Sequence, residues 1–178
     1  NRGVDASKII IAGYPSYFYH QEKNLDFNIK NYIVDDDTIS QAIVMIGQPF
    51  VEDKMLSFEE WSGALNSINT LSKLLNIRTI LKIHPREKIS KYKKCVWTHI
   101  IILPSEVPLH ALFNKYDLVL TVNSTAAYMA QEMGCRVICM HFKTFENSTL
   151  IEFPPGLTYV NDYQQLYDSI AEYLRMNN

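Results

Sequence analysis

A histidine between two basic residues makes residues 82–87 (KIHPRE) the most chemically suggestive segment of this 178-residue sequence. The apolar, β-branched residues directly before it predict a buried strand. Pro85 lacks a backbone N–H and disfavours helix at His84, so the strand should stop at the imidazole. An imidazole flanked by Lys82 and Arg86 suits contact with an anion such as a phosphate. The alternative is a histidine that only caps the edge of a sheet.

Three further polar segments follow predicted strands in the same way. They are residues 47–53 (GQPFVED) after a strand at 42–46, residues 104–106 (PSE) after a strand at 99–103, and residues 123–125 (NST) after a strand at 117–122. Parallel strands end at one edge of a sheet, and ligands bind in the crevice outside that edge. We therefore expect these three loops and His84 to converge on one ligand.

Together, these side chains describe a nucleotide site. Gly47 has no Cβ, so a phosphate could approach the backbone there. Ser124 and Thr125 should begin a helix, where hydroxyls and unpaired backbone N–H groups attract an anion. Glu106 could accept two hydroxyl hydrogen bonds from a ribose, and His84 could protonate a departing phosphate oxygen.

Each of these residues also has a structural explanation when it is taken alone. Ser124 could be a simple helix N-cap, Asn123 a turn residue, and Glu106 a carboxylate that stabilises the first turn of a helix. Only their joint placement favours a nucleotide, and it leaves the reaction open. The sequence has no Gly-x-Gly-x-x-Gly, Walker or Gly-x-Ser-x-Gly motif, which disfavours dinucleotide binding, P-loop hydrolysis and serine-hydrolase chemistry.

The elements that must position these loops are strands alternating with helices. Residues 57–60 (SFEE) match a capping box, and apolar residues recur at helical spacing from there to residue 75. The other expected elements are a strand at 78–83, short helices near 109–113 and 124–133, a strand at 136–140, and a final helix capped by Asp162. This alternation predicts an α/β fold, a Rossmann-like parallel sheet with helices on both faces.

We divide the chain into two parts. Residues 1–41 should form an irregular or linker segment with one short strand at 8–12, and residues 42–178 the Rossmann-like domain. The chain begins at Asn1 rather than Met and has the length of one ordinary domain or of half a larger enzyme.

The composition limits the class of protein. The formal net charge is −2 at pH 7, which argues against bulk nucleic-acid binding, because such proteins usually carry a basic face. A local basic run at residues 88–94 (KISKYKK) is better explained as the solvated face of a helix than as an interaction patch. Apolar residues make up 47% of the chain, which is ample for a buried core.

The cysteines point to a reducing compartment rather than to a metal or disulfide framework. Cys135 and Cys139 bracket a predicted strand and should be small core residues, and Cys95 is isolated from them. The acidic run at residues 35–37 fits a loop or helix start better than a metal site. Because no apolar run is long enough to span a bilayer, we expect a cytoplasmic protein, with peripheral attachment to the inner membrane as an alternative, and no metal or cofactor.

The ordered set of four segments resembles bacterial sialyltransferases, in particular glycosyltransferase family 52, the lipooligosaccharide sialyltransferase and polysialyltransferase-like group. The resemblance covers roughly residues 42–140 and rests on the His-Pro pair at 84–85, the downstream Glu106, and the Ser-Thr pair at 124–125. It implies the C-terminal, nucleotide-sugar-binding half of a GT-B glycosyltransferase. The donor would be a CMP-activated sugar, such as CMP-sialic acid, and the acceptor a bacterial surface glycan.

The resemblance also implies roles for residues of this chain. His84 would bind the phosphate of the CMP-sugar and help the cytidylate leave, with Pro85 and Arg86 beside it in the donor site. Glu52 and Asp53 stand where the family has an acidic pair followed by glycine, although the next residue here is Lys54. Asp53 is our candidate general base, because it follows a strand end on the predicted edge.

Alternatives remain at this stage. The donor could be CMP-Kdo or a CDP-polyol, and the domain could also be a nucleotide-binding module without catalysis. A complete GT-B enzyme has two such domains, so we expect this chain to be an incomplete transferase. Formation of a homodimer is left open.

Overall fold

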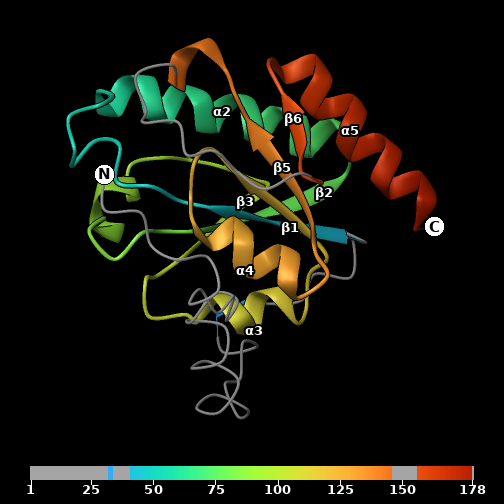
Figure 1. The fold of residues 1–178 in the computed structure, drawn as a ribbon. Helices are drawn as coiled ribbons and strands as arrows, with labels where there is room; N and C mark the ends of the chain where they lie inside the picture. Colours follow the sequence, from blue (N-terminus) through green and yellow to red (C-terminus); the bar gives the residue numbers. More distant parts are fainter. Residues whose placement is uncertain (1–31, 34–40, 146–155, 178) are drawn as a thin grey trace, which may run out of the picture.

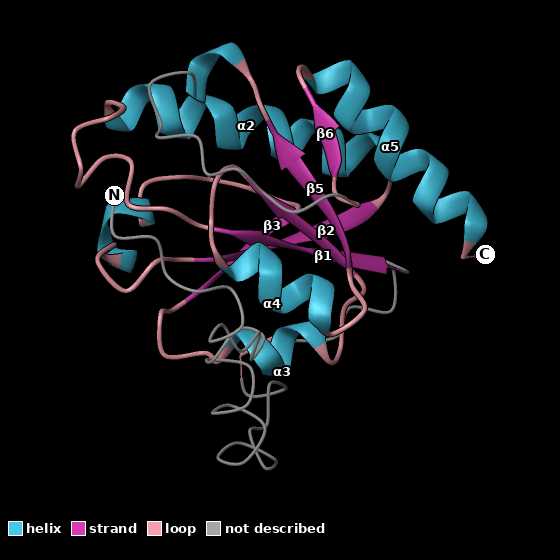
Figure 2. Cartoon of the chain, viewed as in Figure 1, coloured by secondary structure: helices cyan, strands magenta, loops and turns pink. Residues whose placement is uncertain are grey.

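The computed structural model describes residues 32–33, 41–145 and 156–177 of the chain. The strand expected at residues 8–12 and the acidic run at residues 35–37 lie outside the described residues, as does most of the segment 1–41. Within the described part, strands and helices alternate along the chain and form a sheet with helices on both of its faces (Figures 1 and 2).

The sheet contains six strands, and every pair of neighbours in it is parallel. The strands are β1 (Gln41–Ile46), β2 (Ile77–Lys82), β3 (Ile100–Leu103), β4 (Leu118–Thr121), β5 (Arg136–Met140) and β6 (Thr158–Val160). Five of them were expected, within one residue at either end. Strand β6 was not, because three residues at a sheet edge leave too little periodicity to recognise. The predicted α/β fold with a Rossmann-like parallel sheet is confirmed.

The α-helices are α2 (Phe58–Leu74), α3 (Leu109–Phe113), α4 (Ala126–Glu132) and α5 (Tyr163–Met176), with 3₁₀ helices η3 (Ile89–Tyr92) and η4 (Lys143–Phe145). Helix α2 begins with the expected capping box. The Glu60 backbone N–H donates to the Ser57 hydroxyl at 3.1 Å, and the Ser57 backbone N–H donates to the Glu60 carboxylate at 2.7 Å. Asp162 caps α5 by accepting from the Gln165 backbone N–H at 2.8 Å. The basic run is a 3₁₀ turn rather than a longer helix.

Two apolar cores lie on opposite faces of the sheet. Helices α2 and α5 cover one face, where fully buried Trp61 contacts the rings of Phe50 and Phe145. The short helices α3 and α4 cover the other face, whose core includes Ile33 from the segment expected to be a linker. Cys135 and Cys139 are buried and free, as predicted.

The strand order is β3-β2-β1-β4-β5-β6. The chain therefore builds outward from β1 in one direction and then, from β4 onward, in the other. Such a reversal leaves a crevice between the carboxyl ends of the two inner strands, which is where open α/β sheets bind ligands. Among the described residues, no helix is both long and apolar enough to cross a membrane.

Candidate functional site

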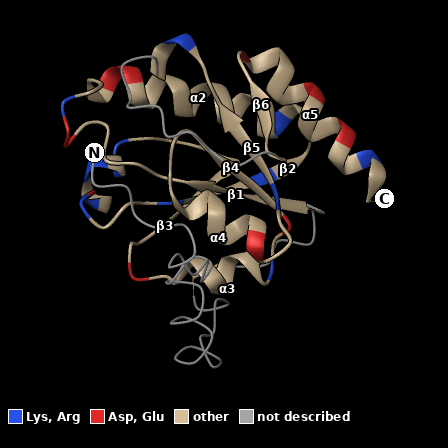
Figure 3. Ribbon diagram, in the orientation of Figure 1, with Lys and Arg blue, Asp and Glu red and all other residues tan. Residues whose placement is uncertain are grey.

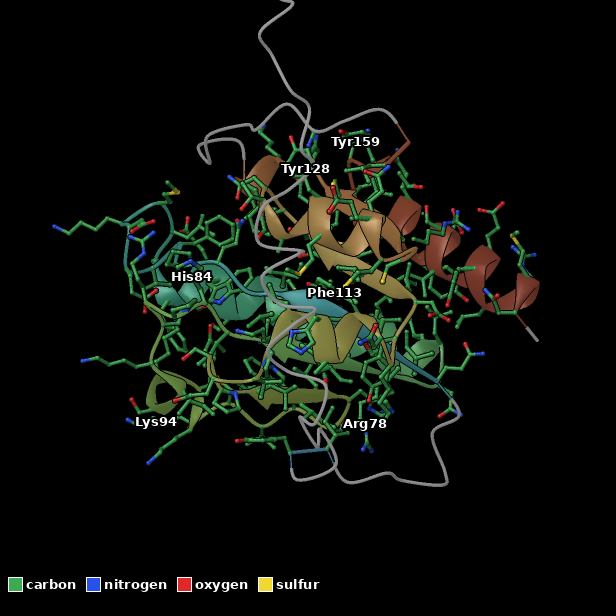
Figure 4. All side chains as sticks on the ribbon, turned by 60° about the horizontal axis from the view of Figure 1, so that its bottom comes forward. Arg78, His84, Lys94, Phe113, Tyr128 and Tyr159 are labelled. Atoms are coloured by element: carbon green, nitrogen blue, oxygen red, sulfur yellow. The ribbon has the colours of Figure 1, made fainter. Side chains whose placement is uncertain are left out.

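A pocket of about 240 Å³ lies at this reversal, at the carboxyl edge of the sheet. It is lined by residues from the ends of β1, β2 and β4 and from helices α3 and α4: Ile46, Gly47, Lys82, Ile83, His84, Pro85, Leu109, Ser124, Thr125, Ala126 and Met129. The structure thus brings together the loops that follow three of the four predicted strands. Charged residues gather along the same edge, on the left in Figure 3, and Figure 4 shows His84 there, at the opposite end of β2 from Arg78.

His84 is held by its own turn. The Arg86 backbone N–H donates to Nδ1 of the imidazole at 3.1 Å, and the Glu87 backbone N–H donates to the His84 carbonyl at 2.9 Å. Because Nδ1 accepts a hydrogen bond, the neutral ring carries its proton on Nε2. Burial lowers the pKa of His84, and the positive charge of Arg86 lowers it further. At neutral pH, His84 is therefore a neutral hydrogen-bond donor through Nε2.

Lys82 lines the pocket from the last position of β2 and is only 6% exposed. Its ammonium group donates to the backbone carbonyls of Ser105 at 3.0 Å and Ile83 at 3.2 Å. Burial lowers the pKa of Lys82, while the charges of Glu106 and Glu87 oppose this shift. An ammonium has three N–H donors, so two backbone contacts leave capacity for an anion.

Glu106 lies outside the lining of the pocket. Its side chain is exposed in the turn after β3, near enough to Lys82 for its charge to raise the pKa of that lysine. The loop after β3 therefore reaches the site through Lys82, by the hydrogen bond to the Ser105 carbonyl and by the charge of Glu106, rather than through the pocket wall. The expected contact of Glu106 with a ribose stays a prediction.

The acidic pair lies beside the pocket in salt bridges. Asp53 forms a bidentate pair with Arg86, in which Nη2 of Arg86 lies 2.8 Å from Oδ2 of Asp53. Glu52 pairs with the ammonium group of Lys91 at 3.0 Å. These pairs join the loop after β1 to the loop after β2. The bidentate contact with Arg86 occupies one acceptor position on each carboxylate oxygen of Asp53, and the other positions can still accept a proton.

Glycine is required at position 47 because neighbouring atoms leave no room for a side chain. The sequence had suggested a different reason, the close approach of a ligand phosphate. A Cβ on Gly47 would lie 2.8 Å from the Glu87 carboxylate and 2.8 Å from the Lys82 carbonyl oxygen. The Gly47 backbone N–H donates to that same carbonyl at 2.8 Å. The space without a side chain is therefore already filled by the end of β2 and the buried Glu87.

The loop after β4 forms a tight entry to α4. The Ser124 hydroxyl accepts from the Ala126 backbone N–H at 3.2 Å, and the Ser124 backbone N–H donates to the Thr121 hydroxyl at 3.2 Å. The N-cap of α4 is Thr125, so Ser124 precedes the cap and its hydroxyl closes a turn rather than capping the helix. The Ser124 O–H can still donate to a ligand. Thr125 lines the pocket at the position before α4, and half-buried Asn123 lies outside the lining.

Sequence reasoning missed the importance of Glu87. Its side chain is fully buried, and it touches His84, Lys91 and Tyr92. A glutamate three residues after a strand-end histidine is a weak signal, because most glutamates are exposed. Only the packing of Tyr92 against this turn makes Glu87 part of the site.

Comparison with solved structures identifies the class of fold. The chain is similar to a UDP-GlcNAc 2-epimerase from Methanocaldococcus jannaschii, with a TM-score of 0.58 and 18% identity over 95% of this chain and 50% of that chain. It is also similar to the wall teichoic acid polymerase TagF (TM-score 0.55, 15% identity, 94% of this chain and 41% of that one). A third similar structure is that of the spinosyn rhamnosyltransferase SpnG (TM-score 0.50, 13% identity, 79% of this chain and 38% of that one). The fold is the Rossmann-like fold of GT-B glycosyltransferases, and the chain spans half or less of these structures.

The family model of alpha-2,8-polysialyltransferases (POLYST) matches residues 9–140, so the chain belongs to that family. A search of curated proteins found no match. The polysialyltransferase part of the resemblance is confirmed by this finding. Membership of glycosyltransferase family 52 and assignment to the C-terminal half stay predictions.

Proposed function

We propose that this domain binds a CMP-activated sugar, with CMP-sialic acid as the donor, for inverting transfer to a bacterial surface glycan. One observation carries the proposal: in a polysialyltransferase-family chain, a single pocket at the strand reversal is lined by His84, Lys82 and Ser124. A neutral N–H donor, a buried ammonium and a hydroxyl form a donor-rich set suited to a phosphate.

In this proposal, the residues of the pocket stabilise the leaving group. The bond between the anomeric carbon and a phosphate oxygen breaks, and its electron pair stays on the phosphate of CMP. Nε2–H of His84 and the ammonium of Lys82 face the charge that develops there. Glu106 holds the ribose hydroxyls at the rim of the pocket. The acceptor hydroxyl forms the new bond as it gives its proton to a base, for which Asp53 is the candidate.

Two solved structures of the same fold contain nucleotide ligands, which supports nucleotide binding by this domain. One is the M. jannaschii epimerase in complex with UDP-GlcNAc and UDP, and the other is TagF soaked with CDPG. In both, the similarity to this chain is that of the fold. The choice of cytidine and of sialic acid rests on the family.

Calorimetry with CMP, UMP and GDP tests the proposal. We expect CMP to bind at least about tenfold more tightly than the other two nucleotides, because each lost polar contact to the base costs about 1 kcal/mol or more. Equal, weak binding of all three would indicate a general nucleotide module. Absence of binding would overturn the proposal.

Transfer is tested separately, because the acceptor must be held near the anomeric carbon with a base in reach. We propose that the 178-residue chain binds CMP but transfers sialic acid poorly, and that a longer chain with a second lobe turns over. The assay is CMP release from CMP-sialic acid with a lactose-type acceptor. In the longer chain, Asp53→Asn should abolish transfer and leave CMP affinity nearly unchanged; a variant that keeps its rate would exclude Asp53 as the base.

A cytoplasmic location, with peripheral attachment to the inner membrane, is compatible with this donor.

A further inference from the structure

The carboxylate of Glu87 is the buried centre of a hydrogen-bond network beneath His84. It has no exposed side-chain surface and accepts from three donors. The Tyr92 hydroxyl donates to Oε1 at 2.5 Å, the Lys91 ammonium lies 2.9 Å from the same oxygen, and the His84 backbone N–H donates to Oε2 at 2.8 Å. A buried carboxylate is costly unless it is paired and hydrogen-bonded, and Glu87 is both.

The network extends into the core beneath α2. The Trp61 indole N–H donates to the Tyr92 hydroxyl at 2.8 Å, and both residues are buried. The Tyr92 oxygen thus accepts from Trp61, which leaves its own hydrogen for Glu87. Burial and the charge of Glu87 raise the pKa of Tyr92, so the hydroxyl stays protonated and remains a donor. The direction of every hydrogen bond from Trp61 to Glu87 is therefore determined.

At its other end, the network closes the turn that carries the imidazole. Glu87 binds the His84 backbone N–H through its side chain and the His84 carbonyl through its own backbone N–H. This fixes the turn from both sides, and it places the Arg86 backbone N–H against Nδ1 of His84. The Nδ1 contact in turn determines the tautomer of the neutral ring.

We propose that Glu87 is a positioning residue for His84, which, supported by Tyr92, holds the imidazole in the tautomer that presents Nε2–H to an anion. The tautomer follows from the turn itself, whereas its effect on ligand affinity rests on the proposed function. Glu87 and Tyr92 do not line the pocket, so they act through His84 and not by contact with the ligand.

The test is ¹⁵N NMR of the histidine rings at pH 8, where His84 is neutral, with a His84→Asn variant to identify its signals. Wild type should show His84 as one tautomer, with the proton on Nε2. Glu87→Gln should mix the tautomers, because an amide has only one acceptor oxygen. When that oxygen accepts from Tyr92, the amide NH₂ faces the His84 backbone N–H and the contact that holds the turn is lost. Tyr92→Phe should mix the tautomers as well, because it removes the hydroxyl while keeping the ring packing.

Tyr163→Phe is the matched control, because it removes a partly buried tyrosine hydroxyl that donates to the Ala64 carbonyl, away from the turn. It should leave the His84 tautomer and CMP affinity unchanged. The Glu87 and Tyr92 variants should lose about threefold to tenfold in CMP affinity, the effect of a misplaced hydrogen bond. Thermal melts of all three variants report whether the fold is retained.

Two outcomes would overturn the proposal. One is wild-type His84 with its proton on Nδ1 or in a mixture of tautomers. The other is a folded Glu87→Gln or Tyr92→Phe variant that loses stability yet keeps the wild-type tautomer, since Glu87 would then be structural only. If wild type fails to bind CMP, the proposed function is wrong, but the NMR comparison still decides the role of Glu87.

Discussion

The loops after β2 and β4 form two walls of the same pocket and are built in different ways. The loop after β2 is charged and is held by residues outside the loop, through Tyr92 in the following 3₁₀ helix and through Asp53 from the loop after β1. The loop after β4 is uncharged and is held by its own neighbours, through the hydroxyls of Thr121 and Ser124.

This difference tells us where each wall is vulnerable. A wall fixed by a buried carboxylate can be disturbed from outside the pocket, because the loss of a partner leaves a buried charge unpaired. A wall that local hydroxyl bonds help to fix should be most sensitive to changes in its own residues. Substitutions in the two loops should therefore change ligand affinity and the free energy of unfolding in different ratios.

The largest effect should come from His84→Ala in the β2 wall. Loss of a hydrogen bond to a charged phosphate costs about 1.5–3 kcal/mol, so CMP affinity should fall about 10- to 100-fold. The free energy of unfolding should change by about 1 kcal/mol or less, because only the contact from Arg86 is lost within the protein. Calorimetry and chemical denaturation measure the two quantities.

His99→Ala provides the control for this change, because His99 is a partly exposed histidine before β3 whose imidazole contacts the hydroxyl of the adjacent Thr98. Its backbone contacts with Asn69 and Thr79 do not depend on the side chain. The variant should leave CMP affinity unchanged. If His84→Ala lowers stability and affinity by the same free energy, His84 is structural and the β2 wall has no special role in binding.

The next effect tests how tightly the β2 wall is packed. Gly47→Ala places a methyl group 2.8 Å from the Glu87 carboxylate and from the Lys82 carbonyl. Overpacking of this kind costs about 1–3 kcal/mol of stability. Gly63→Ala is the matched control within α2, where a Cβ meets nothing within 4 Å, and there alanine should stabilise by about 0.5–1 kcal/mol. Chemical denaturation that gives both variants the same sign would contradict the packing described for Gly47.

A smaller effect is expected in the β4 wall. Ser124→Ala removes one hydroxyl donor to the ligand, which a water molecule can replace, so CMP affinity should fall about threefold to tenfold. The loss of its bond to the Ala126 N–H should cost about 0.5–1 kcal/mol of stability. Ser62→Ala, which removes a hydroxyl bonded to a helix carbonyl in α2, should leave affinity unchanged. If Ser124→Ala weakens CMP more than His84→Ala does, the β4 wall carries most of the binding.

The smallest effect should be that of pH on affinity. The pKa of His84 lies below its usual value of 6.5, so the ring is already neutral at pH 7 and stays neutral as the pH rises. CMP affinity should therefore change less than about twofold between pH 7 and 8, because a single protonation state with Nε2–H persists. Calorimetry that shows a tenfold loss over this range would mean that binding requires a proton that the site loses, either on the His84 imidazole or on the Lys82 ammonium, whose pKa burial also lowers.

Much of the fold could be read from local patterns. The apolar runs at 42–46 and 136–140 became β1 and β5 because a strand covered on both faces needs apolar side chains throughout. The Ser57 capping box began α2, and Gly134 ends the α4 region with a positive φ of 85°, which glycine adopts without strain. These features depend on residues within a few positions of each other.

The sequence by itself also determined which loops follow strands, and so which residues lie at the carboxyl edge. It did not determine the strand order, which decides that the loops after β1, β2 and β4 share a pocket while Glu106 stays outside its lining. Nor did it reveal the burial of Glu87 or the pairing of Asp53 with Arg86. Those depend on how segments tens of residues apart pack together. Local periodicity records which face of an element is buried, but not which distant partner covers it.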